Sequence, residues 1–199
     1  SHGSGSCDKT IMIYLDNAAT TFKKPINVIE AINHALTSYG NSGRGVYRAA
    51  LDSGRMVYET REKISKFFGS SDPSKVIFTC NATEGLNIVL FGLFGSGDHV
   101  ISTVTEHNSV LRPLYKLEKT KNIGIDFIGI DESGKLKYDE FEKHIKENTK
   151  AIIVNHVSNV SGEIADLEYI GKTARKNNLY FIVDVSQSAG NIKIDMNKT

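Results

Sequence analysis

Apolar residues in this chain fall into short unbroken runs that alternate with stretches of helical periodicity. The runs predict strands at residues 76–79, 100–104, 125–130, 151–157 and 180–184, and shorter extended segments at 11–15 and 192–195. Apolar positions three and four residues apart predict helices at 26–39, 49–68, 84–94, 110–118, 138–146 and 167–176. Pro25 suits the first turn of the first helix.

Strand and helix alternate from residue 76 almost to the end of the chain. This alternation is typical of a mostly parallel sheet that carries helices on both faces and has right-handed crossovers. We therefore predict an α/β fold in three layers. The glycine-rich segment 40–45 separates the first two helices and is predicted to be a loop.

The composition is that of an ordinary globular protein. The chain has 199 residues, of which 40% are hydrophobic and 24% charged, and its net charge is +1. This length favours a single core, and this charge gives no bulk attraction to nucleic acid or to an anionic membrane. The sequence has no apolar run long enough for a transmembrane helix. Residues 1–6 resemble vector-derived sequence and not a signal peptide, so nothing argues for export.

The chain contains two cysteines, Cys7 and Cys80, and neither belongs to a CxxC motif or a Cys/His cluster. We therefore expect neither a disulfide scaffold nor a metal site, and a reducing, cytoplasmic location fits. Cys80 follows a predicted strand and is expected to be packed.

Candidate chemistry collects where the predicted strands end, which is where open α/β sheets bind ligands. After the first strand, Ala82 and Thr83 begin a helix whose N–H groups and dipole can hold a phosphate. The alternative is an ordinary helix cap at Asn81 or Thr83. After the second strand, His107 is a base, a ligand or a stacking surface, or else a structural histidine. After the fourth, Asn159 can donate to a ligand oxygen, although loop asparagines usually shape turns.

The last predicted strand leads directly into Asp184, and Gln187 follows three positions later. One edge of the sheet therefore gathers a phosphate-type helix start, a ring, an amide, an acid and a glutamine. Pyridoxal 5′-phosphate has a phosphate, an aromatic ring, a ring hydroxyl and a basic ring nitrogen, and it would use all of these groups. An acid beside the ring nitrogen keeps that nitrogen protonated and strengthens the ring as an electron sink.

Five motifs stand in order along the chain: Tyr14-Leu15-Asp16-Asn17-Ala18-Ala19-Thr20-Thr21, Ala82-Thr83-Glu84, Thr105-Glu106-His107, Ser158-Asn159 and Val183-Asp184-Val185-Ser186-Gln187. Together they resemble the class V aminotransferases, and within that group the cysteine desulfurase and selenocysteine lyase branch. The resemblance runs from about residue 13 to the end of the chain. It implies that the three-layer sandwich is the large-domain part of the pyridoxal-phosphate-dependent transferase fold, which is aspartate-aminotransferase-like.

The resemblance implies a role for each residue at the strand ends. Ala82 and Thr83 would hold the cofactor phosphate, and His107 would stack on the pyridine ring. Asp184 would pair with the pyridine nitrogen. The ring hydroxyl would be contacted by two amide side chains, Asn159 and Gln187.

On the substrate side the resemblance implies four residues, Asn17, Ala18, Ala19 and Arg44. Many relatives carry histidine near Gly43 and Tyr47 and this chain does not, which leaves the substrate and subgroup open. The implied reaction removes sulfur from cysteine, or selenium from selenocysteine, and gives alanine. The implied partners are a small amino-acid substrate, a second copy in a homodimer and a sulfur-acceptor protein, without nucleic acid or a membrane.

The family's Schiff-base lysine lies in a Ser-x-His-Lys context that these 199 residues do not contain. Lys193 and Lys198 lack that context and are predicted to lie on the surface. We expect the lysine and the sulfur-accepting cysteine beyond Thr199, so the chain is predicted to be an N-terminal fragment that is inactive alone. The expected organisation is vector-derived residues 1–6, an N-terminal segment 7–48 with a helix and an active-site loop, and a partial cofactor-binding domain 49–199.

Three alternatives stay open. In the first alternative, the parent protein is a class V aminotransferase that acts on a small amino acid. The chain is a non-catalytic, Rossmann-like module for phosphate or nucleotide, although it lacks GxGxxG after its first strand and its glycine-rich stretch 92–97 follows a helix. The chain is a truncation that binds nothing.

Overall fold

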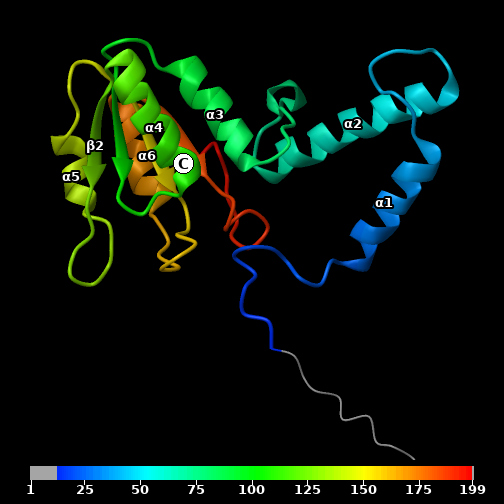
Figure 1. Ribbon diagram of the computed structural model, residues 1–199, viewed down its shortest axis with the longest axis horizontal. Coiled ribbons are helices and arrows are strands. Elements are labelled where there is room, and N and C mark those ends of the chain that lie inside the picture. The colour runs from blue at the N-terminus through cyan, green and yellow to red at the C-terminus, as the bar shows by residue number, and fades with distance from the viewer. Residues whose placement is uncertain (1–12, 199) are drawn as a thin grey trace, which may run out of the picture. The chain divides into compact units, whose positions relative to one another are not determined.

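The structure is a computed structural model that describes residues 13–198 (Figure 1). The chain divides into two compact units, Ser1–Ser53 and Gly54–Thr199. Residues 1–6, Cys7 and the first part of the expected segment 11–15 lie outside the described residues.

The first unit contains the complete helix α1, Ile26–Ser38. Pro25 is its N-cap, and the fixed φ of proline suits the entry to a helix. The apolar stripe that predicts this helix is not buried, and Leu36 is 80% exposed. The helix is therefore supported within its unit by its own backbone hydrogen bonds and not by a core.

The loop after α1 is closed by a serine of the next helix, α2, which spans Arg48–Phe67. The Ser53 hydroxyl accepts from the Gly40 N–H at 2.9 Å and lies 2.6 Å from the Ala49 carbonyl, to which it donates. These bonds fix the start of the predicted loop against the start of α2.

The second unit is built on a sheet of four parallel strands in the order β2-β1-β3-β4. The strands are β1 His99–Thr103, β2 Gly124–Ile128, β3 Thr149–Asn155 and β4 Tyr180–Asp184. Each coincides with a predicted apolar run, because strands covered on both faces are apolar on both sides. The chain passes from β1 to β2 on one side and then to β3 on the other, so the direction of winding reverses between β1 and β3.

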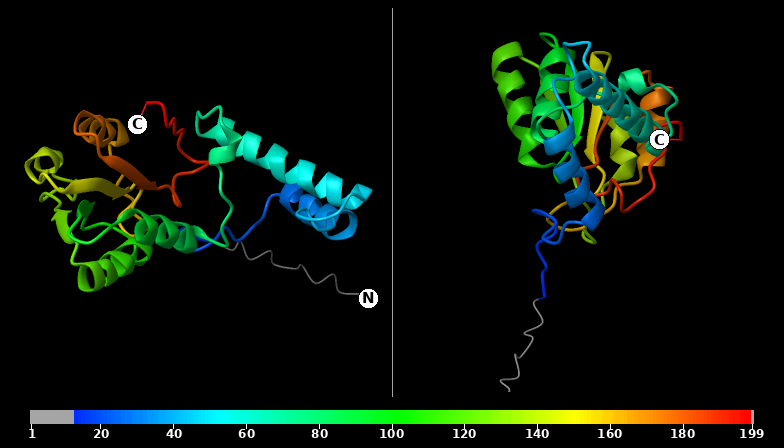
Figure 2. Two further views of the ribbon diagram at one scale, coloured as in Figure 1. Left: turned by 90° about the horizontal axis from the view of Figure 1, so that it is seen from above. Right: turned by 90° about the vertical axis from the view of Figure 1, so that its right-hand side faces the viewer.

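Helices cover both faces of this sheet, as Figure 2 shows in its left view. One face carries α3 Ala82–Leu93 and α4 Asn108–Lys121, and the other carries α5 Tyr138–Lys143 and α6 Leu167–Lys176. The predicted three-layer α/β sandwich is therefore confirmed, and these helices and strands begin and end within a few residues of the predicted positions.

Successive side chains of the strands enter two separate cores. Val100 of β1 packs with Leu90 of α3 and Leu114 of α4. Its neighbour Ile101 packs with Phe141 of α5 on the opposite face. The alternation follows from the two-residue period of a strand. Burying one such side chain contributes roughly 1.5–3 kcal/mol, so these clusters hold the helices on the sheet.

The predicted strand at residues 76–79 is wrong, and the described parts of two predicted extended segments form no strand. Residues 76–79 follow a short 3₁₀ helix, η1 Pro73–Lys75, and form no strand. Residues 13–15 and 192–195 also form none, apart from an isolated bridge between Ala189 and Ile192. An extended run needs a neighbouring strand to receive its backbone hydrogen bonds, and the described part of the chain places none beside these segments.

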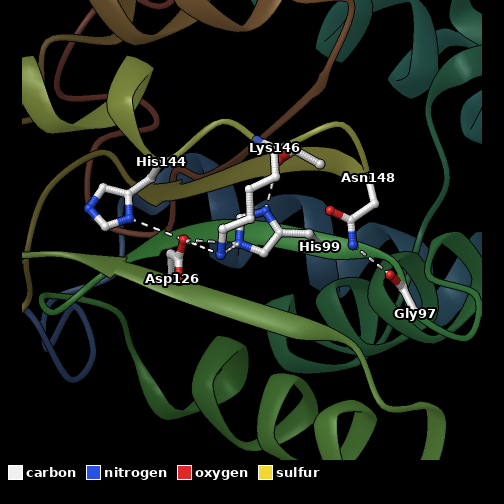
Figure 3. A network of polar contacts seen from close by, with 7 residues as sticks. Gly97, His99, Asp126, His144, Lys146 and Asn148 are labelled. Carbon is white, nitrogen blue, oxygen red and sulfur yellow. Dashed lines mark hydrogen bonds and ion pairs between the residues drawn. The ribbon is translucent and has the colours of Figure 1, made fainter.

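A polar network joins the strands near their amino ends (Figure 3). The Asp126 carboxylate lies 2.7 Å from Lys146 Nζ, 3.1 Å from His144 Nδ1 and 3.2 Å from His99 Nε2. His99 Nδ1 lies 2.8 Å from Thr149 Oγ1. Burial lowers the pKa of His99 and the charge of Lys146 adds to this effect, so the pKa is lowered although the charge and hydrogen bond of Asp126 act to raise it. Burial raises the pKa of Asp126, but the hydrogen bonds from Lys146 and His144 outweigh it and bring that pKa below its usual range.

Across residues 13–198, the structure contains no helix with the length and apolar character that a membrane span requires.

Candidate functional site

The carboxyl ends of β1 and β3 flank the point where the winding reverses. Loops that leave the strands on either side of such a point diverge, and the crevice between them is where open α/β sheets bind ligands. The ladder between these strands runs from His99 opposite Thr149 to Ile101 opposite Ile152. The residues predicted to bind the cofactor follow β1 or β3, end or follow β4, or begin α3.

Helix α3 begins at this edge with a complete cap. Asn81 is the N-cap, and its Oδ1 accepts from the Glu84 N–H at 2.8 Å. Glu84 Oε2 in turn accepts from the Cys80 N–H at 2.6 Å. The N–H groups of Ala82 and Thr83 lie in the first turn, have no acceptor within the helix and suit an anion. Asn81 therefore forms the predicted cap without using the two amides predicted to hold a phosphate.

His107 is the N-cap of α4, in the loop after β1. Its Nδ1 accepts from the Ser109 N–H at 3.1 Å and lies 2.7 Å from Ser109 Oγ. The imidazole is exposed, and together with Thr83 it lines a pocket of about 400 Å³ between α3 and α4. The ring thus serves as a helix cap and also presents a fixed, flat surface beside the start of α3.

Asp184 ends β4 and is buried. Its Oδ1 accepts from the Ser186 N–H at 2.9 Å and from Ser186 Oγ at 2.5 Å. Asp184 and Ala82 line the same cavity, of about 350 Å³. The other lining side chains are mainly apolar and include Leu86, Val89, Ile182 and Val185. A carboxylate with one oxygen already bonded, apolar walls and a small residue at a helix start fit a flat aromatic ring that carries a basic nitrogen and a phosphate.

The two amides predicted to contact the ring hydroxyl lie in turns at the same edge. Asn159 is exposed in the turn after β3, where Ser158 Oγ accepts from the Ser161 N–H at 3.2 Å. Gln187 lies in the turn after β4, and its backbone carbonyl accepts from Asn191 Nδ2 at 3.3 Å. Neither side chain lines the two cavities described above, so their contacts with a ring hydroxyl stay predictions.

The four substrate-side candidates belong to the first unit. Asn17, Ala18 and Ala19 form a turn in which the Ala19 N–H donates to the Asp16 carbonyl at 3.2 Å. Arg44 is exposed in the loop before α2. Their roles at the cavity of the second unit stay predictions.

One buried acid at this edge received no role from the sequence. Glu106 precedes His107 and is 8% exposed. Its Oε1 accepts from Thr103 Oγ1 at 2.6 Å and from the Asn155 N–H at 2.8 Å, whereas its buried Oε2 has no hydrogen-bond partner among the described residues. Burial raises the pKa of Glu106 to about 7 against the effect of these two bonds, and the charge of Asp184 contributes in the same direction. The sequence does offer one signal for Glu106, because it is an acid in a strand-end loop next to the candidate ligand residue His107.

The Cys80 thiol and the two lysines considered from the sequence lie on the surface. Cys80 is exposed, so the prediction that it is packed is wrong, because the segment before it forms no strand. Lys193 and Lys198 are exposed, as predicted. Among residues 13–198, no group of three or more His, Cys, Asp or Glu side chains is arranged to hold a metal ion.

Comparison with known families identifies the group to which this arrangement belongs. The family model described as aminotransferase class-V matches residues 13–199. The chain belongs to the class-V aminotransferase family. Enzymes of this family, including the cysteine desulfurases, depend in general on pyridoxal 5′-phosphate. The predicted resemblance is therefore confirmed at the level of the family.

Curated relatives of this class-V chain are similar over nearly all of its length. A probable cysteine desulfurase of Borreliella burgdorferi is 37% identical over 197 residues, which cover 96% of this chain and 46% of the relative. A probable cysteine desulfurase of Pyrococcus abyssi is 36% identical over 191 residues, which cover 94% of this chain and 47% of the relative. The chain thus spans about half the length of the curated relatives it matches.

Solved structures share the fold of this class-V chain. The apo structure of cysteine desulfurase from Thermococcus onnurineus NA1 superposes with a TM-score of 0.87 at 36% identity, covering 94% of this chain and 47% of that one. The structure of SspA in complex with cysteine gives a TM-score of 0.85 at 27% identity, covering 93% and 54%. The predicted pyridoxal-phosphate transferase fold is confirmed by these similarities.

Proposed function

We propose that this chain is the cofactor-binding part of a pyridoxal-phosphate-dependent cysteine desulfurase. The observation that carries the proposal is the cavity shared by Asp184 and Ala82, next to the pocket shared by Thr83 and His107. The named relatives and solved structures support the same reaction class.

The N-terminus of α3 and the carboxyl end of β4 hold opposite ends of the cofactor in this proposal. The N–H groups of Ala82 and Thr83 bind its phosphate, because a helix N-terminus attracts anions. Asp184 accepts from the protonated ring nitrogen through Oδ2, since both bonds from Ser186 go to Oδ1. An acid in that position favours the protonated ring. When bound, the cofactor supplies an electron sink for negative charge that develops on the substrate.

His107 covers one face of the ring in this proposal, and its bond to Ser109 keeps the imidazole from rotating. A fixed aromatic cover orients the ring and excludes water from that face. The ring hydroxyl is oriented by two amide side chains, Asn159 and Gln187.

For the whole protein we propose cysteine or selenocysteine as substrate and alanine as the organic product. Asn17, Ala18, Ala19 and Arg44 lie on the substrate side in this proposal. The proposed partners are a second copy of the protein and a sulfur-acceptor protein, and the proposed location is the cytoplasm. The support for these proposals is the description of the relatives as cysteine desulfurases.

Equilibrium dialysis of the chain against pyridoxal 5′-phosphate tests the proposed site. Asp184→Asn keeps the shape of the side chain and removes its charge, so the dissociation constant should rise about tenfold or more, the size expected for one charge-assisted hydrogen bond. Asp139→Asn on α5 is the matched control, because Asp139 is exposed and pairs with Lys143 on the surface. Equal affinities for the three proteins would contradict the proposal.

Turnover of cysteine by the chain alone tests a separate expectation. No Ser-x-His-Lys motif occurs in the sequence, so we expect cofactor binding without alanine formation. Alanine released at an enzymatic rate would show that one of the present lysines performs the chemistry.

A further inference from the structure

Glu106 is a buried acid at the edge of the sheet that carries the candidate site. It lies in the loop after β1, beside the reversal in winding between β1 and β3. Its side chain is 8% exposed, although carboxylates are rarely buried without full pairing. The residue that follows it, His107, is the proposed cover of the cofactor ring.

One oxygen of Glu106 joins two strands beyond the end of their ladder. The β1–β3 register runs to Ile101 opposite Ile152. Oε1 accepts from Thr103 Oγ1 at the end of β1 and from the Asn155 N–H at the end of β3. This carboxylate therefore sets how far the two strand ends separate at the crevice.

The other oxygen, Oε2, is buried and has no partner among the described residues. A buried carboxylate with one unsatisfied oxygen favours its protonated form. Thr103 on β1 and Asn155 on β3 act on Glu106 as neutral donors, and Asp184 on β4 is the charged group that acts on it. Asn155, which donates to Glu106, lies opposite Asp184 in the β3–β4 ladder. The two acids therefore lie at neighbouring strand ends, and a negative charge on Asp184 disfavours a second negative charge on Glu106.

We propose that Glu106 is a positioning residue of the cofactor site. Its carboxyl group joins the ends of β1 and β3. Its Oε2 holds a proton while the charge of Asp184 is uncompensated, and it releases this proton when a cation pairs with Asp184. The proposal rests on the proposed function, because that cation is the protonated ring nitrogen of pyridoxal 5′-phosphate. The bond that breaks is the O–H bond of Glu106, and its proton passes to the solvent buffer.

Unfolding of the chain without cofactor tests whether Glu106 holds this proton. Unfolding by denaturant is measured from about pH 5.5 to about pH 8.5 for the wild type and for Glu106→Gln, which keeps an oxygen acceptor and cannot ionise. The wild type should lose stability relative to this variant as the pH rises through about 7. Glu132→Gln, at an exposed position, should follow the wild type. Parallel profiles for wild type and Glu106→Gln would overturn the proposal.

A ¹³C NMR titration of the Glu106 carboxyl carbon in the wild type measures the same proton without a variant, should Glu106→Gln fail to fold. A midpoint well above the usual value for glutamate is expected, and a midpoint at that usual value would overturn the proposal.

Affinity for pyridoxal 5′-phosphate at pH 6 and pH 8 tests the coupling to Asp184. Binding that releases a proton strengthens as the pH rises, so the wild type should gain roughly three- to tenfold over Glu106→Gln, the size expected when one neighbouring charge is neutralised. The same pH dependence in both proteins would overturn the coupling while leaving the cofactor site intact. Absence of binding in both would contradict the proposed function itself and reduce Glu106 to a structural bond between strands, whose proton the unfolding profiles still measure.

Discussion

Two buried titratable side chains lie toward opposite ends of the strands and respond to pH in opposite directions. The raised pKa of Glu106 makes its ionisation unfavourable in the fold, so stability is lost as the pH rises through about 7. The lowered pKa of His99 makes its protonation unfavourable, so stability is lost as the pH falls below about 6.5. From about pH 4.5 to about pH 6.5 the two effects act in opposite directions and partly cancel, so substitution is needed to separate them.

His99→Gln isolates the effect at the amino ends of the strands. The unfolded chain takes up a proton at His99 near pH 6.5, before the folded chain does, so the wild type should lose stability on acidification. The variant should lose less between pH 7.5 and pH 5, measured by urea unfolding. It should also be about 1–3 kcal/mol less stable at pH 7.5, because partners such as Thr149 lose a buried hydrogen bond.

His34→Gln is the control for that measurement, because His34 is exposed on α1. Its profile should follow the wild type. Identical pH slopes for wild type and His99→Gln would show that His99 does not titrate in the folding transition.

At the residue scale, the sequence locates side chains whose role depends on their place in an element. The positions of Asp184 and His107 at strand ends are predictable because each follows an apolar run, whereas their roles toward a cofactor stay proposals. The role of Glu106 depends on a bond to Asn155, which is 49 residues away. No local pattern encodes that contact, because it exists only once β1 and β3 are aligned.

At the element scale, helix α2 ends in a Schellman motif that requires its glycine. The Gly69 N–H donates to the Lys66 carbonyl at 3.1 Å, and the Ser70 N–H donates to the Ser65 carbonyl at 2.9 Å. Gly69 has a φ of +79°, and a Cβ there would meet the side chain of Asp195. The backbone conformation therefore favours glycine here, and a larger residue would also have to displace the Asp195 carboxylate.

Paired alanine substitutions test this assignment by urea unfolding. Gly69→Ala should destabilise the protein by about 1–2 kcal/mol or more, because alanine is strained in the left-handed region. Gly92→Ala is the matched control within α3, where a Cβ meets nothing within 4 Å. It should stabilise the protein by about 0.5–1 kcal/mol through helix propensity. Equal effects of the two substitutions would contradict the motif.

The elements also show where sequence patterns stop. The four strands of the sheet are predicted correctly because their apolar runs alternate with amphipathic helices that cover them. Residues 76–79 carry a similar run, yet they form no strand. An apolar run records a tendency to be extended and buried, whereas a strand also requires a neighbour to receive its hydrogen bonds.

At the scale of the whole molecule, apolar surface and open sheet edges favour association between chains. Ile77 is 70% exposed and Phe78 is 47% exposed, and β2 and β4 are the outer strands of the described sheet. Exposed apolar patches and unpaired strand edges are the usual sites of self-association.

Analytical ultracentrifugation tests this expectation. The wild-type chain should associate with increasing concentration, and Ile77→Lys should weaken that association severalfold with little change in stability, because Ile77 is mostly exposed. Val160→Lys is the control, since Val160 is 90% exposed in a turn and this substitution adds the same charge at a different site. If both substitutions weaken association equally, net charge and not the 76–79 segment is responsible.

Asp184 is proposed to accept a hydrogen bond from the protonated ring nitrogen of pyridoxal 5′-phosphate. ¹⁵N NMR of cofactor labelled at that nitrogen, bound to the chain, tests it most directly. We expect a protonated nitrogen with the wild type and a loss of that signal with Asp184→Asn at equal occupancy. A neutral ring nitrogen in the wild-type complex, or the same signal in both proteins, would contradict it.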